Sequence, residues 1–285
     1  MDYAVVIGIS ICVLMIIFGI IFSEGRLEIA NIKMFFDFSS FLIVAGGSIG
    51  ATLTAITLRE GFQAITIVRE VLKPPKIDWQ GTVKLFAYIA NEARREGVLS
   101  LQNKVDRQEN DLIKSGLQLI VDGADCDVLF QVIGTKIQIK KNEDKLGVRI
   151  FSKMGSIAPA FGMLGTVMGL IQVVANLSEP EKLGGGIALA FITTFYGIIL
   201  ANVVFNPIAE KLNRNNEEKS TYYEMILTGL QSILEGDNPF IVEEKLKAFF
   251  PVSARPVPAV LVNKKAPALK GKKKYGTTKL QTETS

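Results

Sequence analysis

Threonine hydroxyls are the groups best placed to bind an ion in the two longest uncharged stretches of this 285-residue chain. Thr166 lies at the centre of residues 154–178, and Thr194 lies beside the centre of residues 183–209. As helices rising ~1.5 Å per residue, both stretches can cross a ~30 Å hydrocarbon layer. A hydroxyl at that depth either offers a cation a neutral oxygen ligand or bonds back to its own helix. Thr193, which points about 100° away from Thr194 on a helix, is an alternative pore-facing hydroxyl.

The chain lacks the side chains that most enzymes and metal sites use. It has no histidine, which removes His-based acid–base catalysis, His metal ligands and Ser-His-Asp triads. Its two cysteines, Cys12 in an apolar run and Cys126 in a charged region, cannot form a metal site alone and are poorly placed for a disulfide. We therefore expect no enzyme, no catalytic residue, no metal and no cofactor. A net charge of +4 is mildly basic and does not favour a nucleic-acid partner.

Residues 154–178 predict a helix that another helix can approach closely. Four glycines recur at helical spacing and leave a smooth face: Gly155, Gly162, Gly165 and Gly169. Pro159, inside the run, removes a backbone donor and favours a kink. We expect such a helix either to line a pore or simply to pack in a bundle.

Acidic and basic side chains are missing from the interior of the four apolar runs, at residues 3–22, 38–58, 154–178 and 183–209. Ion-coupled membrane proteins nearly always place an ionisable group at that depth. Either this chain conducts nothing, or another polypeptide supplies the carboxylate. We therefore expect a hetero-oligomer in which a partner helix brings an acid against the glycine face.

The four runs predict four membrane-spanning helices in a chain whose mean hydropathy is +0.31. A signal peptide is the alternative for the first run, which lacks the basic start and small-residue cleavage site of such peptides. All but three of the 32 Lys and Arg residues lie in residues 59–153 or from Lys211 onward, so we expect these segments and both termini in the cytoplasm. Spans three and four then run in opposite directions. This puts Pro159 and Pro207 near the inner face and both central threonines near the midplane.

Residues 59–153 predict a small cytoplasmic helical domain inserted between the second and third spans. Apolar residues recur every three or four positions in its predicted helices, at residues 59–72, 83–95, 112–121 and 125–141. We expect the first of these to continue the second span and to stop at Pro74-Pro75. About 90 residues make a thin independent core, so the domain should lean on neighbouring helices or on copies of itself.

The predicted fold class is an all-α integral membrane protein with five segments. These are the first two spans in residues 1–58, the cytoplasmic helical domain in 59–153, the third and fourth spans in 154–209, a cytoplasmic C-terminal helix in 210–250, and a disordered basic tail in 251–285. We expect a short loop at residues 179–182 between the last two spans. Pro207 should close the far end of the fourth span.

Several stretches together resemble the flagellar motor stator A subunit, MotA/PomA, of the MotA/TolQ/ExbB superfamily. They are FFDFSSFLIVAGGSIGATL, EARREGVLSLQNKV, GLQLIVDG, MGSIAPAFGMLGTVMGL and ITTFYGIILANVVFNPIA, and the likeness covers residues 1 to about 250. The related ExbB and TolQ proteins have three spans and an outside N-terminus. The four-span count therefore favours the stator.

The resemblance implies a pentameric ring of this chain around a MotB/PomB dimer, surrounded by lipid in the bacterial inner membrane. The partner's transmembrane Asp binds the transported ion, H+ or Na+, and its periplasmic domain grips peptidoglycan. Ion flow turns the ring, whose cytoplasmic domain pushes the rotor protein FliG and so drives motility and chemotaxis. The alternatives are an ExbB/TolQ-like energy-coupling subunit of another envelope machine and a membrane scaffold without ion flux.

The resemblance also implies a rotor contact in the cytoplasmic domain. Arg94 matches the loop arginine that acts on the rotor, and Gln102 stands where the family has its partner glutamate. Acids occur nearby at Glu96, Asp106 and Glu109, but none is in register. Without the resemblance, Arg94 would be part of an ordinary solvated helix face.

Five further residues match ion-pathway positions of the family. Pro159 and Pro207 match the prolines of the third and fourth spans, and Thr194 matches the pore-lining threonine. Thr166 matches a position that is threonine in sodium-driven members and usually alanine in proton-driven ones, which slightly favours sodium. Asp37 matches the loop acid at the periplasmic mouth, although capping of the second span is a second interpretation.

Overall fold

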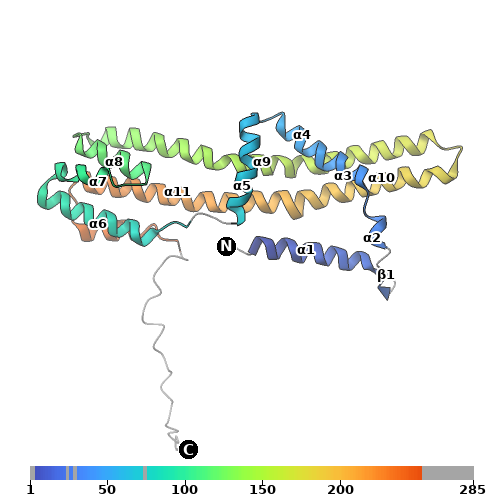
Figure 1. Ribbon diagram of the computed structural model, residues 1–285, viewed down its shortest axis with the longest axis horizontal. Helices are drawn as coiled ribbons and strands as arrows, with labels where there is room; N and C mark the ends of the chain where they lie inside the picture. Colours follow the sequence, from blue (N-terminus) through green and yellow to red (C-terminus); the bar gives the residue numbers. More distant parts are fainter. Residues whose placement is uncertain (1–3, 24–25, 28–30, 73–75, 252–285) are drawn as a thin grey trace, which may run out of the picture. The chain divides into compact units, whose positions relative to one another are not determined.

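The computed structural model describes residues 4–23, 26–27, 31–72 and 76–251 (Figure 1). Before the long helices come α1 (Ala4–Ile21), the strands β1 (Phe22–Ser23) and β2 (Arg26–Leu27), α2 (Asn31–Met34), α3 (Phe38–Phe41), the π-helical turn η1 (Leu42–Gly46), α4 (Gly47–Leu53), α5 (Leu58–Leu72), α6 (Trp79–Glu96), the 3-10 turn η2 (Val98–Leu101), α7 (Gln102–Val105) and α8 (Asp111–Val121). They are followed by α9 (Cys126–Ala175), α10 (Pro180–Ile199), the π-helical turn η3 (Leu200–Phe205), α11 (Asn206–Leu234) and α12 (Pro239–Lys247).

The described chain is helical, as the sequence predicts, except for a minimal hairpin in which β1 pairs antiparallel with β2. Residues Met1–Phe249 form one compact unit, and Phe250–Ser285 form a second. Nearly all of the predicted basic tail, residues 252–285, lies outside the described residues. The fold that follows is therefore that of the first unit.

Two long antiparallel helical runs dominate this unit. The 50-residue helix α9 begins at Asp125, whose carboxylate accepts a hydrogen bond from the Val128 amide, and it joins the charged and charge-free parts of the sequence in one rod. After a turn at residues 176–179, α10 starts at Pro180, a residue preorganised for the first turn of a helix. Figure 1 shows α10 and α11 running side by side with α9, and both pack against it. The loop between the runs is thus shifted from the predicted 179–182.

The helical path does not break at Pro207 but continues from Pro180 to Leu234, so Pro207 ends the uncharged run without ending the helix. Pro207 lacks a backbone N–H and occupies the first turn of α11, immediately after η3. The π-helical geometry of η3 rearranges the backbone hydrogen bonds just before the proline, so the helix continues without a break. The predicted C-terminal helix is also divided: α11 ends at Leu234, and α12 follows Gly236, which has a positive φ of 72°.

The helix at residues 59–72 is present but does not continue the second span. That span is built from α3, η1 and α4, and it stops at Leu53. A turn separates it from α5, where Glu60 accepts hydrogen bonds from the Thr57 amide (2.7 Å) and hydroxyl (2.9 Å) while its own amide donates to Thr57 Oγ1 (3.3 Å). This reciprocal capping starts a new helix. Pro74 and Pro75, the predicted stop, lie outside the described residues.

The other helices predicted within residues 59–153 are present as α6, α8 and the first part of α9. Their apolar faces close on α11, which comes from a later part of the sequence. Leu230 of α11 occupies the space in which Gly116 would carry a side chain, and Phe86 of α6 does the same at Gly229. The inserted segment therefore shares its core with α11, consistent with its small size.

Within the described part of the chain, two helical runs are long and apolar enough to cross a membrane: Cys126–Ala175 and Pro180–Leu234. Val6–Ile21 and Phe38–Leu53 are shorter apolar helices. The most apolar windows of the two long runs are only 22% and 28% buried within the chain, whereas the core helix of a soluble protein would be mostly covered. Their apolar surface therefore needs an outside cover.

Candidate functional site

The three central threonines lie at one level of the α9–α10 pair. Thr193 is fully buried, and its side chain fills the space at Gly165, the residue next to Thr166. Its hydroxyl donates to the carbonyls of Leu189 (2.8 Å) and Ala190 (3.1 Å). Of the three side chains, Thr193 therefore contributes most to packing between the two helices.

The other two hydroxyls also donate to their own helices. Thr194 Oγ1 lies 3.1 Å from the Ala190 carbonyl, and Thr166 Oγ1 lies 2.5 Å from the Met163 carbonyl. Both side chains are half-buried. A hydroxyl that donates its proton to a carbonyl keeps its lone pairs, so each oxygen can still accept a hydrogen bond or ligate a cation.

The glycine face of α9 is covered by the later helices of the same chain. A side chain at Gly162 would meet the backbone of Thr193 and Thr194 at 3.1–3.2 Å, and one at Gly169 would overlap Gly186 and Ala190. Gly155 leaves room for the side chain of Asn206, from the start of α11. The expectation that a partner helix lies against this face is therefore wrong, since the bare backbone lets α10 approach first.

The two prolines lie in α9 and at the start of α11. Pro159 lies inside α9, and a side chain at Gly197 of α10 would come within 3.3 Å of its Cα. Pro207 opens α11 directly beside Asn206, the residue packed on Gly155. The structure thus brings both prolines to the region where the charge-free helices give way to charged sequence.

Asp37 caps α3, since its carboxylate accepts a hydrogen bond from the Ser40 amide at 2.6 Å. Tyr196 of α10 holds the same turn: its hydroxyl accepts from the Asp37 amide (3.2 Å) and donates to the Phe35 carbonyl (2.8 Å). Tyr196 was missed from the sequence because only its position next to the Asp37 turn reveals its role. The start of α3 is therefore tied to α10 through Tyr196, two residues after Thr194.

The predicted rotor residues lie at the other end of the unit. Arg94 and Arg95 are exposed in the last turn of α6, and neither makes an ion pair within the described residues. Gly97, with φ of 84°, turns the chain into η2. Gln102 is exposed at the start of α7, where its amide donates weakly to Gln118 Oε1 at 3.4 Å. The three nearby acids, Glu96, Asp106 and Glu109, are exposed as well.

Lys104 holds this loop in place, a role that the sequence pattern does not reveal. Its ammonium lies 3.1 Å from the Tyr88 hydroxyl and 3.4 Å from a Glu92 carboxylate oxygen, both on α6. The hydrogen bond to Tyr88 raises the pKa of Lys104, with the charge of Glu92 adding to it. The loop that carries Gln102 is therefore fixed against the helix that carries Arg94.

A second polar cluster ties three helices together. Lys219 of α11 lies 2.9 Å from Asp144 of α9 and 3.2 Å from Glu70 of α5, and the Tyr223 hydroxyl donates to Asp144 at 3.1 Å. Burial opposes the charged form of Lys219, but the hydrogen bond and charge of Asp144 outweigh it and raise the pKa of Lys219. Burial, followed by the charge of Asp144, also raises the pKa of Tyr223. At neutral pH Lys219 therefore stays charged and Tyr223 stays neutral. This polar cluster, called the brace below, suits a structural role between α5, α9 and α11.

These features define a helical membrane protein in which polar side chains lie between closely packed apolar helices. Similarity to known proteins agrees with that class. Residues 104–225 match the MotA/TolQ/ExbB proton channel family. Motility protein A of Borreliella burgdorferi is 33% identical over 81% of this chain and 89% of its own length, and chemotaxis protein PomA of Vibrio alginolyticus is 33% identical over 77% and 86%. The structure of the flagellar MotAB stator complex from Bacillus subtilis matches with a TM-score of 0.77 and 27% identity, over 88% of this chain and 97% of that one.

The chain therefore belongs to the MotA/TolQ/ExbB proton channel family. Within that family it is a stator subunit of the flagellar motor, which confirms the resemblance seen in the sequence. It is a membrane-embedded protein of ion transport and motility.

Proposed function

We propose that this stator subunit forms a pentameric ring around a MotB/PomB-type partner and converts H+ or Na+ flow into torque on FliG. One observation carries the proposal. The charge-free parts of α9 and α10 pack through bare glycines and bring Thr166, Thr193 and Thr194 to one level. Such a pair provides neutral oxygen ligands but no carboxylate, so the partner must supply the acid.

The proposed ion path runs from Asp37 past the threonines to the two prolines. Asp37 attracts cations at the periplasmic mouth, and the hydroxyl oxygens of Thr166 and Thr194 meet the ion beside the partner's Asp. Pro159 and Pro207 mark the inner end of the path. The hydrogen bonds of Tyr196 to the Asp37 turn fix the position of the periplasmic mouth relative to the threonines.

Torque is proposed to pass along α9, because this single helix runs from the threonine level to the cytoplasmic core. That core, completed by α11, presents Arg94 and Gln102 to FliG.

The proposed membrane arrangement has four spans in the inner membrane. Both termini lie in the cytoplasm, and residues 59–153 form the rotor-facing domain. The hydroxyl at Thr166 supports sodium slightly over protons, since sodium needs several oxygens to replace its water shell.

Deletion of the gene tests the motor role. We expect cells that build flagella but do not rotate them, and rescue by the intact gene. Normal swimming with a defect in another envelope process would instead indicate an ExbB/TolQ-like machine.

Reconstitution tests the missing acid. In liposomes the chain alone should pass no H+ or Na+, whereas the chain with its partner should pass ions and should stop when the partner's transmembrane Asp becomes Asn. A specific ion current from the chain alone would contradict the need for a partner carboxylate.

A further inference from the structure

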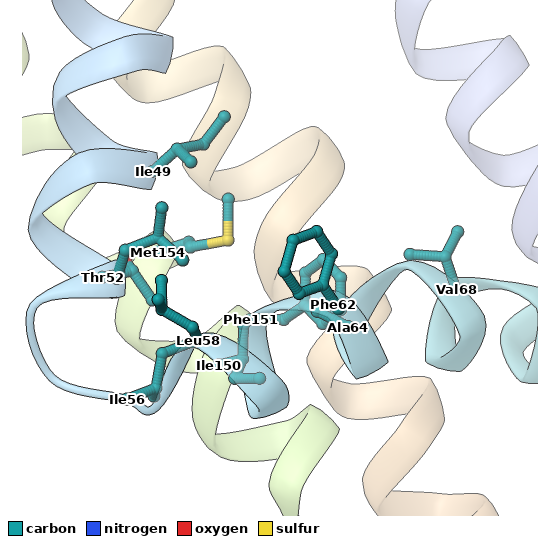
Figure 2. Close-up of a pocket in the computed structure, with 12 residues that line it drawn as sticks. Ile49, Thr52, Ile56, Leu58, Phe62, Ala64, Val68, Ile150, Phe151 and Met154 are labelled. Carbon is teal, nitrogen blue, oxygen red and sulfur yellow. The ribbon is translucent and has the colours of Figure 1, made fainter.

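An apolar pocket of about 460 Å³ opens where α4, α5 and α9 meet. Figure 2 shows side chains from these three helices, and from the turn before α5, converging on it. Its lining includes Ile49, Leu58, Phe62, Ala64, Phe151 and Met154. Among the described residues that line the pocket, Thr52 alone has a polar side chain, and its hydroxyl already donates to the Ser48 carbonyl at 2.8 Å. The pocket thus suits an apolar occupant, and its volume is within the range of about 300–1,000 Å³ typical of ligand sites.

The pocket lies at the boundary between apolar and charged sequence. On α9 the lining residues Phe151 and Met154 flank Lys153, the last charged residue before the charge-free half of the helix. On the other side, α4 ends its apolar run at Leu53, and α5 opens with Arg59 and Glu60. In a membrane-embedded protein this boundary falls at the level of the lipid headgroups.

The mouth of the pocket is lined by large apolar side chains that the chain leaves uncovered. Leu58 is 76% exposed and Phe62 is 74% exposed, and both side chains line the pocket (Figure 2). Exposed apolar surface of this extent marks a site of contact with membrane or partner.

Three basic residues neighbour the pocket lining in sequence. Arg59, Arg149 and Lys153 are all exposed, and each is next in sequence to a lining residue. The acid at this rim, Glu60, is held by the amide and hydroxyl of Thr57, and the charge of Arg149 helps to lower its pKa. The charged residues Arg59, Glu60, Arg149 and Lys153, next to the lining in sequence, therefore sum to a net positive charge. At headgroup level such basic groups attract anionic lipids.

We propose that this pocket binds one anionic phospholipid, with an acyl chain between α4, α5 and α9 and the headgroup phosphate at Arg59, Arg149 and Lys153. The inference concerns the membrane-embedded state of the chain and is independent of the ion it couples to. The bound lipid fills the gap left by the break between α4 and α5, and so supports the position of α5 against α9.

Native mass spectrometry of the full chain with its partner tests the proposal. The complex is incubated with equal amounts of phosphatidylglycerol and phosphatidylcholine that carry the same acyl chains. Wild type should retain phosphatidylglycerol at least tenfold over phosphatidylcholine. Ala64→Phe, which fills the pocket, should reduce retention of both lipids about tenfold, whereas Ala188→Phe, at an exposed site on α10, should not. Equal effects of these two variants would overturn the pocket assignment.

The headgroup contact has its own variants. Arg149→Gln with Lys153→Gln should remove the preference for phosphatidylglycerol and leave retention of phosphatidylcholine unchanged. The matched control is Lys84→Gln with Arg107→Gln, two exposed charges far from the pocket in sequence. Loss of the preference in both double variants, or in neither, would overturn the role of the rim.

A photo-crosslinker identifies the occupant directly. Phe62→p-benzoylphenylalanine keeps an aromatic side chain at the mouth of the pocket and needs no change elsewhere. A phosphatidylglycerol adduct on this residue is the expected product. An adduct with a second copy of the chain or with the partner would show that protein covers the pocket and would overturn the proposal.

Discussion

Gly165 of α9 and Thr193 of α10 lie in such close contact that a side chain on Gly165 would overlap the whole Thr193 side chain. Thr193 is fully buried and cannot swing into solvent, and its hydroxyl is already bonded to two carbonyls of its own helix. The spacing of α9 and α10 is therefore set at the level of the proposed ion site.

Gly165→Ala should push the two helices apart. Overpacking of a tight contact costs about 1–3 kcal/mol, so we expect a lower unfolding temperature in detergent and impaired swimming. Gly184→Ala is the matched control, because nothing lies within 4 Å of a side chain at Gly184. Equal unfolding temperatures for the two variants would show that the close contact between Gly165 and Thr193 does not determine the stability of the protein.

Thr166→Ala tests the ion. If the Thr166 oxygen ligates sodium, swimming speed in wild type should rise with external sodium at fixed pH, and the variant should need more sodium for the same speed. Its flagella and its assembly with the partner should be unchanged. Speed that ignores sodium in both strains would leave protons as the driver and Thr166 as a packing residue bonded to Met163.

Asp144→Ala should destabilise the packing of α5, α9 and α11, because it leaves the half-buried ammonium of Lys219 with the exposed Glu70 as its one ion-pair partner among the described residues. We expect a loss of about 1–3 kcal/mol in the free energy of unfolding. Glu243→Ala removes one of the two carboxylate partners of the exposed Lys247 and should change stability by no more than about 0.5 kcal/mol.

The same brace should show a pH dependence. The pKa of Lys219 is raised in the folded state, so its stabilising contribution is complete below the unfolded-state pKa of about 10.4 and is lost as pH rises through the folded-state value. The stability difference between wild type and Asp144→Ala should therefore shrink above about pH 10. A difference that stays constant from neutral pH to that range would assign the effect of the substitution to packing.

Arg94→Glu tests the rotor face. Arg94 is exposed and without an ion pair in the described chain, so the change should leave the fold and the partner complex intact while it lowers swimming speed. Exposed charge contacts are individually modest and screened by salt, so the loss should be partial and should deepen when Arg95→Glu is added. Wild-type swimming of the double variant would reject a role for this face.

Local patterns in the sequence were sufficient for most helices. The segments predicted at 83–95 and 112–121 lie within α6 and α8, because apolar residues at helical spacing produce a one-sided helix wherever it packs. The cap at Asp37 was also among the interpretations of the sequence, since a carboxylate before a helix can bond only a few amides nearby. Lys104, Tyr196 and the Lys219–Asp144 pair were not foreseen, because their partners lie up to 161 residues away in the chain.

The sequence by itself determined that this is a helical membrane protein without its own intramembrane acid, because hydropathy and charge are properties of composition. It also carried the motifs of the family to which the chain belongs. Only the tertiary structure decided that α10, rather than a partner, covers the glycine face, that the helix continues through Pro207, and that α5 starts anew after Leu53. The physical reason is that local sequence leaves each of these choices open. A glycine face can pack on a helix of the same chain or of another, and a proline or a capping residue can lie in a continuous helix or at a break. Packing between segments distant in sequence selects among them.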